Sequence, residues 1–262
     1  MNVDAIRPPI RIDRQDNIAL LMLDRPEKRN AISAATWQAL PAAAAELEAD
    51  DSVNVIIVTG TGGHFSAGAD ISEFEATFAT PASAMAYGAE MTEGIEAIAS
   101  MRKPVLAAID GVCIGGGVAL ALACDIRIAA ANARFAITPA KLGMLYPPAD
   151  TRRLASCVGI SAAKRLLFGA DVIDGREALA IRLIDALAEP GEALQQAKVE
   201  ATRIGGVSQY TVRGMKQFLD NLADPEADAR QSEAFIAALE GADFCEGRAA
   251  FMERRTPEFT YR

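Results

Sequence analysis

The stretch that decides the fold is Lys103 to Ala129, which reads "KPVLAAIDGVCIGGGVALALACDIRIA". Short apolar runs at 104–110 and 125–130 are of the kind found in strands that are buried in a parallel sheet. Between them three consecutive glycines precede an apolar segment, 117–123, which is expected to be a helix. A strand, a helix and a second strand in this order predict an α/β core.

The same alternation continues on the N-terminal side. Strands are expected over 10–14 and 18–23, followed by a helix over 34–49 that Asn30 or Ser33 caps. A buried strand over 53–60 and a helix over 82–101 then lead to the opening stretch.

Beyond residue 161 the strand signal fades, and the pattern indicates only helices. We therefore predict two regions, an α/β core over residues 1–200 and a helical region over 201–262 that packs on the core or on a neighbouring subunit. The predicted helices of this part are 161–168, 175–180, 192–204, 208–221, 228–239 and 246–254.

The composition favours a protein that acts on small molecules. The chain has 262 residues, 51% of them apolar, with a net charge of −9 and a pI near 4.8. Nucleic acids and anionic membranes need a basic surface, so neither is an expected partner. No apolar run reaches the ~20 residues of a membrane span, and Met1 to Pro9 have no apolar core of the signal-peptide type. We expect a cytoplasmic protein.

A metal site is not expected. His64 is the only histidine, and the cysteines stand far apart without a CxxC pair, so the usual zinc ligands are lacking. In a reducing compartment the thiols are expected to be buried and unbridged, and apolar neighbours favour a packing role for Cys113. The four cysteines are Cys113, Cys124, Cys157 and Cys245.

Two glycine-rich loops each follow a predicted strand. The first, "GTGGHFSAGADISEFE" over 60–75, ends at Asp70 and Glu73, whose spacing predicts a capping box at a helix start. The second, "DGVCIGGGVALALACD" over 110–125, lacks the lysine of a phosphate loop and the GxGxxG spacing. Two such loops can supply one backbone N–H each to a single carbonyl oxygen, which is an oxyanion hole.

In this order the two loops resemble the crotonase (enoyl-CoA hydratase/isomerase) superfamily. The resemblance covers nearly the whole chain. It rests on "RPEKRNAIS" (25–33), "HFSAGADI" (64–71), the opening stretch, and "AKLGMLYPPADTRRL" (140–154).

The resemblance implies a crotonase (ClpP/crotonase-like) fold of repeated ββα units with a helical C-terminal trimerisation region. It implies a homotrimer or a dimer of trimers, and an acyl-CoA thioester as substrate, with no cofactor because coenzyme A is part of that substrate. By motif position the oxyanion donors would be Ala67 and Gly116. The residues that would line the coenzyme A path are Lys28, Arg29, Ala31, Ala69, Asp70 and Ile71.

This chain departs from the family at two positions. Family hydratases carry their two glutamates where this sequence has Ala119 and Pro139. Hydration needs a base to activate water and an acid to protonate carbon, so hydratase activity of ordinary speed is not expected. Loss of CO2 from a malonyl-type thioester needs the oxyanion hole but no base. The segment "FAITPAKLGMLY" (135–146) is similar to one in methylmalonyl-CoA decarboxylase, a crotonase relative, and by that analogy Tyr146 would hold the substrate carboxylate or protonate the enolate.

Two other hypotheses stay open. In one, the chain is a slow hydratase or isomerase in which Asp150 or Glu73 has replaced the missing acid and base. In the other, it is a non-catalytic acyl-CoA binder. His64 and Ser66 lack an acidic partner and do not form a nucleophilic triad, so His64 is interpreted as a loop residue and Asp125 as a structural carboxylate.

Overall fold

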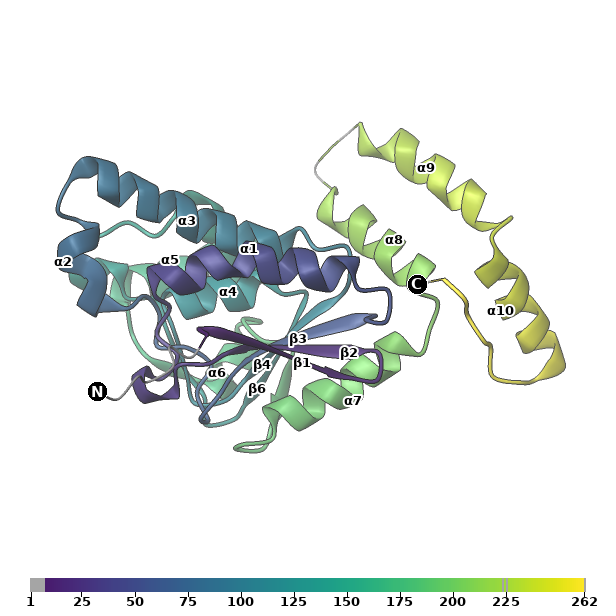
Figure 1. Ribbon diagram of the computed structural model, residues 1–262, viewed down its shortest axis with the longest axis horizontal. Coiled ribbons are helices and arrows are strands. Elements are labelled where there is room, and N and C mark those ends of the chain that lie inside the picture. The colour runs from purple at the N-terminus through teal and green to yellow at the C-terminus, as the bar shows by residue number, and fades with distance from the viewer. Residues whose placement is uncertain (1–7, 223, 225, 262) are drawn as a thin grey trace, which may run out of the picture.

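The computed structural model describes residues 8–222, 224 and 226–261. Residues 1–7, which belong to the segment without a signal-peptide pattern, lie outside this range. Within it the chain folds into an α/β core with a mixed main sheet, from which three C-terminal helices extend (Figure 1). The expected α/β fold is confirmed.

The main sheet has six strands among the described residues. In spatial order they are β1 (Ile10–Gln15), β2 (Ile18–Leu23), β3 (Val55–Gly60), β4 (Val105–Ile109), β6 (Ile126–Ala130) and β9 (Ala186–Ala188). β1 pairs antiparallel with β2, and every later pair is parallel. A second sheet joins β5 (Val112–Ile114), β7 (Arg134–Ala136) and β8 (Ile173–Asp174).

The unbroken apolar strands are explained by helices on both faces of the main sheet. In β2, Ala19 and Leu21 face one hydrophobic cluster, while Ile18 and Leu20 face the other, as the alternation of side chains in a strand requires. The first cluster packs under α1 (Ala34–Ala49), α3 (Pro81–Ala99), α4 (Gly116–Ala123) and α5 (Pro148–Gly169). The second packs against α7 (Ala193–Gly205) on the opposite face (Figure 1).

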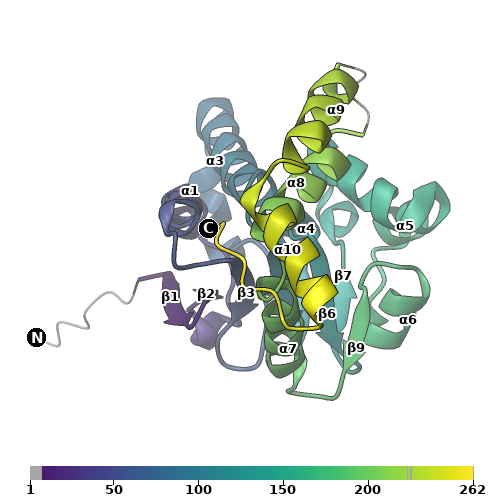
Figure 2. The same ribbon diagram turned by 90° about the vertical axis from the view of Figure 1, so that its right-hand side faces the viewer.

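Short elements connect these layers. They are the 3-10 turns η1 (Pro26–Lys28), η2 (Ile71–Glu73) and η3 (Pro139–Leu142), and the helices α2 (Phe74–Thr77) and α6 (Gly175–Ala180). The C-terminal helices are α8 (Gln209–Asp220), α9 (Ala227–Ala238) and α10 (Ala242–Glu253). Figure 2 shows α8 closest to the core, with α10 in front of it.

The structure differs from the sequence predictions after residue 147. β8 and β9 lie in the part that was expected to be purely helical; they have two and three residues, too few to show a strand period. The helix expected at 161–168 is the second half of α5, which begins at Pro148 and is interrupted at Gly159 by a φ of 77°. The boundary predicted at 200/201 falls inside α7, which packs on the sheet, so the structural division follows Gly205.

In the part of the chain that the structure describes, none of the helices combines the length and the apolar character that crossing a bilayer takes.

Candidate active site

The two glycine-rich loops meet at the carboxyl ends of their strands. Ser66 donates its N–H to Val112 O over 2.9 Å, and Ile114 donates its N–H to Ser66 O over the same distance. Gly68 has a φ of 91°, and a Cβ at this position would lie 2.7 Å from Ile114 O. Only glycine combines this backbone conformation with so close an approach, so the sequence of the first loop holds it against the second.

Between Phe65 and Asp70, the amide of the first loop that lacks an acceptor in the described structure is that of Ala69. Ala67 donates its N–H to Arg29 O over 2.9 Å, and Asp70 donates its N–H to Ile32 O over the same distance. Gly68 donates its N–H to Ser66 Oγ. The N–H of Ala69 has no acceptor among the residues that the structure describes. The prediction that Ala67 supplies an oxyanion donor is therefore wrong, because its hydrogen is already used within the fold.

The second amide belongs to Gly116, the first residue of α4. The N-cap residue is Gly115, which has no side chain to cap the helix, and within the described chain the N–H of Gly116 has no acceptor. A Cβ built on Gly116 would lie 3.7 Å from Ala69 N, so the two unpaired amides are close neighbours. A helix N-terminus also carries partial positive charge. Together they can bind one carbonyl oxygen that is gaining negative charge.

Buried polar side chains fix the first loop. Asn30 donates from Nδ2 to Thr61 O (2.8 Å) and His64 O (2.6 Å). Ser66 Oγ donates to Asn30 O over 2.9 Å while accepting the N–H of Gly68. His64 Nδ1 accepts the N–H of Val112 at 3.3 Å. The interpretation of His64 as a structural loop residue is confirmed.

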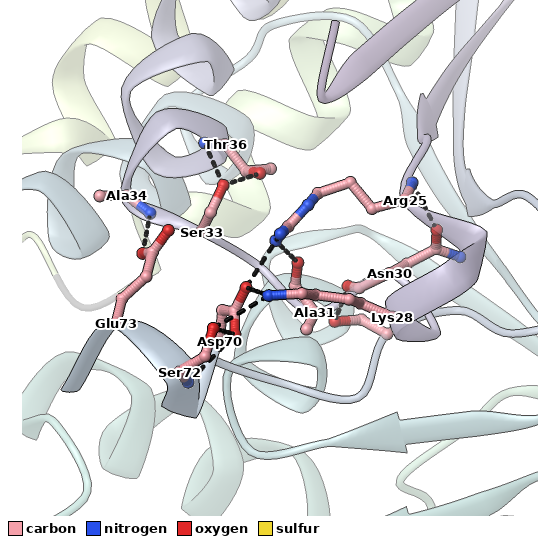
Figure 3. Close-up of polar contacts among 11 residues, drawn as sticks. Arg25, Lys28, Asn30, Ala31, Ser33, Ala34, Thr36, Asp70, Ser72 and Glu73 are labelled. Atoms are coloured by element: carbon pink, nitrogen blue, oxygen red, sulfur yellow. Dashed lines mark hydrogen bonds and ion pairs between the residues drawn. The ribbon is translucent and has the colours of Figure 1, made fainter. Parts of the chain in front are cut away.

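Lys28 and Ala31, two of the residues predicted for the coenzyme A path, lie close to Asp70, which is a third (Figure 3). The Asp70 carboxylate is only 5% exposed and accepts hydrogen bonds from Lys28 Nζ (2.8 Å), Arg25 Nη2 (2.9 Å) and Ser72. Burial raises the pKa of Asp70, but the hydrogen bonds from Lys28, Ser72 and Arg25 outweigh it and hold this pKa well below its ordinary range. Asp70 is therefore a permanent anion that ties η1 to η2.

The other predicted coenzyme A residues differ in exposure. Arg29 is exposed and has a φ of 50°, Ala31 is buried, and Ile71 is 70% exposed. Arg25, which the sequence did not single out, joins Asp70 to Ala31 by donating from Nη1 to Ala31 O over 2.7 Å. The exposed side chains lie on η1 and η2, which Asp70 holds together.

Glu73 does not form the predicted capping box with Asp70. Its Oε2 accepts the N–H of Ala34 over 2.8 Å, at the start of α1, where Ser33 Oγ accepts the N–H of Thr36 (Figure 3). Of the two caps expected for α1, Ser33 is the one used. Glu73 therefore serves as a second cap of α1, and its carboxylate is occupied in this structure.

Ala119 and Pro139 are the two residues that the sequence resemblance aligned with the glutamates of family hydratases. Ala119 lies one turn beyond Gly116 in α4 and is buried, and Pro139 begins η3. Trp37, which the sequence analysis did not single out, packs against Gly116: a Cβ at Gly116 would lie 3.1 Å from Trp37 Cζ2. The indole Nε1 of Trp37 donates to the Tyr87 hydroxyl over 3.2 Å.

Tyr146 lies against the second loop. Its hydroxyl donates to Gly115 O over 3.4 Å. Burial raises the pKa of Tyr146 well above its ordinary value, so the phenol stays protonated. Gly115 C=O and Gly116 N–H belong to one peptide unit, and the structure has no cis peptide bond in its described part. Because the C=O and N–H of a trans peptide point in opposite directions, the hydroxyl lies behind the donor amide.

Asp150 is buried beside Tyr146, with 3% of its surface exposed. Arg153 donates from Nη1 to Asp150 Oδ1 over 3.3 Å and from Nη2 to Glu96. Burial raises the pKa of Asp150 to about 6, and the charge of Arg153 opposes this rise only in part. Asp150 is therefore a carboxyl that can titrate near neutral pH.

Two residues interpreted as structural keep that role. Cys113 is fully buried, and burial raises the pKa of its thiol well above the ordinary value. Asp125 Oδ2 accepts the N–H of Val105 over 2.7 Å and pairs with Lys216 Nζ at 2.8 Å. Within the described residues, neither side chain accepts a hydrogen bond from the donor amides.

Comparisons with known proteins identify the family of this chain. A family model described as enoyl-CoA hydratase/isomerase matches residues 13–262. A crotonyl-CoA hydratase of Syntrophomonas wolfei is 36% identical over 95% of this chain and 96% of its own length. A short-chain-enoyl-CoA hydratase of Clostridium acetobutylicum is 33% identical over 94% of this chain and 95% of its own length. The crystal structure of an enoyl-CoA hydratase/isomerase family protein from Hyphomonas neptunium has a TM-score of 0.93 and 42% identity, over 97% of this chain and 98% of that one. This chain belongs to the enoyl-CoA hydratase/isomerase family.

Proposed function

We propose that this protein binds an acyl-CoA thioester and removes CO2 from a malonyl-type acyl group. The thioester oxygen accepts the N–H groups of Ala69 and Gly116. The bond between the α-carbon and the carboxylate carbon breaks, its electron pair passes into the thioester enolate, and CO2 leaves. The enolate carbon then takes a proton. The observation that carries the proposal is the unpaired amide pair. The expectation, from the sequence resemblance, that Ala119 and Pro139 replace the two family glutamates supports it.

The role of Tyr146 follows from the side of the peptide on which its hydroxyl lies. A hydrogen bond to Gly115 O polarises the peptide unit and strengthens its N–H as a donor, because hydrogen bonds in a chain reinforce one another. We assign Tyr146 to positioning the Gly116 amide, in place of the direct contact with substrate that the sequence analogy suggested. The enolate carbon then takes its proton from water, which leaves as hydroxide.

A second candidate function is slow hydration of an enoyl-CoA. Two observations favour it: relatives that carry the name of enoyl-CoA or crotonyl-CoA hydratase, and the buried carboxyl of Asp150, whose pKa burial raises to about 6. A carboxyl that titrates near neutral pH has the property needed for general acid–base catalysis.

Mass spectrometry in D2O separates these functions. The protein is incubated with a mixture of enoyl-CoA and malonyl-type CoA thioesters. Loss of CO2 with one deuterium gained on carbon is the expected result. Addition of D2O across the enoyl thioesters would replace the proposal with hydration, and tight thioester binding without turnover would identify a non-catalytic binder.

We also propose that copies of the chain associate through the C-terminal helices as a homotrimer or a dimer of trimers. Large apolar side chains are exposed on α9 and α10, which an isolated chain would leave in water. Multi-angle light scattering should give three or six times the 27.7 kDa of one chain; a monomer mass would contradict this assignment. The exposed side chains are Phe235, Ile236, Leu239, Phe244, Phe251 and Met252.

A further inference from the structure

The hydroxyl of Tyr87 has a proton that the fold does not use. Tyr87 lies on α3, which packs beside α1 (Figure 1). A Cβ at Gly94 of α3 would lie 2.9 Å from Trp37 O, so the absence of a side chain lets the two helices approach closely. Trp37 Nε1 donates to the Tyr87 hydroxyl over 3.2 Å. Since an indole N–H can only donate, the phenol oxygen accepts, and within the described chain its own proton has no acceptor.

The Tyr87 hydroxyl and the Gly116 backbone lie on the same edge of one indole ring. Nε1 of Trp37 contacts the hydroxyl, and Cζ2, on the same side of the ring, lies 3.1 Å from a Cβ built on Gly116. That Cβ is in turn 3.7 Å from Ala69 N. Trp37 is fully buried, whereas Tyr87, Ala69 and Gly116 are partly exposed. The indole therefore holds the phenol beside the two unpaired amides, on the side where a substrate can approach them.

The phenol is a neutral donor in acidic surroundings. Burial raises the pKa of Tyr87, the hydrogen bond from Trp37 lowers it in part, and the charges of Glu73, Asp70 and Glu90 raise it again. The hydroxyl therefore stays protonated at neutral pH. It can donate a hydrogen bond to an oxygen of a bound acyl group but brings no positive charge to it.

A neutral donor suits a carboxylate that leaves as CO2. In that step negative charge moves from the carboxylate to the thioester oxygen, so a cation on the carboxylate would stabilise the bound substrate more than the transition state. A phenol fixes the position of the carboxylate at a smaller cost, while the two amides stabilise the oxygen that gains the charge. In a malonyl-type thioester a single carbon separates the carboxylate from the thioester carbonyl, which matches the placement of Tyr87 and Gly116 on one indole edge.

We propose that Tyr87 binds the carboxylate of the malonyl-type acyl group by donating a hydrogen bond from its hydroxyl. This assignment rests on the proposed function and names a second substrate contact beside the amides. No proton is transferred, because the electron pair of the broken carbon–carbon bond stays on the enolate and the hydrogen bond is released when CO2 leaves.

The test uses the full chain with sulfoacetyl-CoA and acetyl-CoA as probes. The sulfonate of sulfoacetyl-CoA carries the negative charge of the malonyl carboxylate but cannot leave as CO2. Trp37 is the only tryptophan of the chain, so its fluorescence reports binding at the amides. The wild type should bind sulfoacetyl-CoA more tightly than acetyl-CoA by about tenfold or more, as expected for a hydrogen bond to a charged group. Tyr87→Phe should lose this preference and bind acetyl-CoA as the wild type does.

Two further variants serve as controls. Tyr210→Phe removes a phenol hydroxyl from α8 and should keep the preference for sulfoacetyl-CoA. Thr138→Val removes another hydroxyl near the amides, since Thr138 Oγ1 lies 4.0 Å from a Cβ built on Gly115, and it should keep the preference as well. A preference lost in Thr138→Val and kept in Tyr87→Phe would overturn the assignment.

The remaining outcomes separate this assignment from the proposed function. If the wild type releases CO2 from malonyl-CoA and Tyr87→Phe keeps the preference for sulfoacetyl-CoA, the assignment of Tyr87 is overturned and decarboxylation stands. An equal loss of affinity for both probes in Tyr87→Phe also overturns it, because the residue would then act only by holding Trp37. If the wild type releases no CO2 but its preference depends on Tyr87, the hydrogen bond to an acidic acyl group is supported and decarboxylation is overturned.

Discussion

The two sides of the candidate active site are built differently. On the amide side, Asn30, Ser66 and Asp70 hold the first loop through hydrogen bonds of 2.6 to 3.1 Å. On the second side, behind the Gly116 amide, the contacts of Tyr146 with Gly115 and of Asp150 with Arg153 are 3.4 and 3.3 Å long. The first side fixes backbone donors, whereas the second holds the half-buried Tyr146 and the buried Asp150, both with raised pKa values.

The difference shows where catalytic power is expected. Donors that are fixed before the substrate binds need no reorganisation when the oxyanion forms, and they contribute most of the rate in such sites. The contacts of Tyr146 and Asp150 on the second side are longer and weaker. These side chains can therefore support the donor geometry but do not define it. Changes on the amide side should therefore affect turnover most, and changes at residues 146–150 should affect it less.

Removing the Ala69 amide should have the largest effect. Replacing Ala69 by lactic acid turns its N–H into an ester oxygen without changing the side chain, and kcat should fall by about 10²–10³-fold, the usual loss for one oxyanion donor. Stability should change little, because this N–H has no protein partner in the described structure. Single-turnover kinetics on the thioester identified in D2O, together with a thermal melt, measure both.

The matched control is the same ester at Ala67. Its N–H bonds to Arg29 O, so the ester should cost about 1 kcal/mol of stability and leave kcat nearly unchanged. The opposite pattern, with kcat lost at Ala67 and kept at Ala69, would return the donor role to Ala67.

The sequence allowed both loops and the Gly116 amide to be predicted, but not which amide of the first loop is free. Glycines and an apolar strand before each loop predicted where the backbone would be exposed, and Gly116 was identified correctly as an amide at a helix start. Ala67 and Ala69 are indistinguishable by side chain. Which of them is free depends on Arg29 O, which the fold brings from the preceding segment. Glu73 was assigned to the wrong helix for the same reason, because Ala34 is close only in three dimensions.

Asp150→Asn should have the next largest effect, on stability as a function of pH. Burial raises the pKa of Asp150 from 3.8 to about 6 in the folded protein. The folded state therefore favours the protonated acid: this contribution is complete below pH 3.8 and is lost as the pH rises through 6. At about 1.4 kcal/mol per pKa unit, the loss approaches about 3 kcal/mol.

The variant should thus gain stability over the wild type between pH 4 and pH 7, by up to about 3 kcal/mol less the lost contact with Arg153. Urea unfolding at several pH values measures this gain. Asp220→Asn is a control outside the site, where burial also raises the pKa of the carboxyl. A difference that does not vary with pH would show that Asp150 is not held in its protonated form.

Tyr146→Phe should lower kcat by about tenfold with KM unchanged, since it removes one hydrogen bond behind the donor peptide. A tyrosine that donated the proton itself would cost 10²–10⁴-fold and change the pH profile. Measuring kcat as a function of pH therefore shows whether Tyr146 positions the Gly116 amide or transfers a proton. Tyr210→Phe, which removes a phenol hydroxyl on α8, should leave kcat within twofold of the wild type.

Lys28→Met should have the smallest effect on turnover. It tests the exposed residues around Asp70. Lys28 is 43% exposed and shares Asp70 with Arg25, so its ion pair contributes about 0–1 kcal/mol to stability. If its ammonium also meets a coenzyme A phosphate, KM should rise by about fivefold at low salt, and the rise should shrink at 0.5 M salt, where the Debye length is only a few ångströms. Lys198→Met, on α7 at the opposite face of the sheet, should leave KM unchanged. If Lys28→Met leaves KM unchanged at both salt concentrations, the role of Lys28 is to hold Asp70 and not to bind substrate. The first loop would then be fixed by the protein's own charges before any substrate binds.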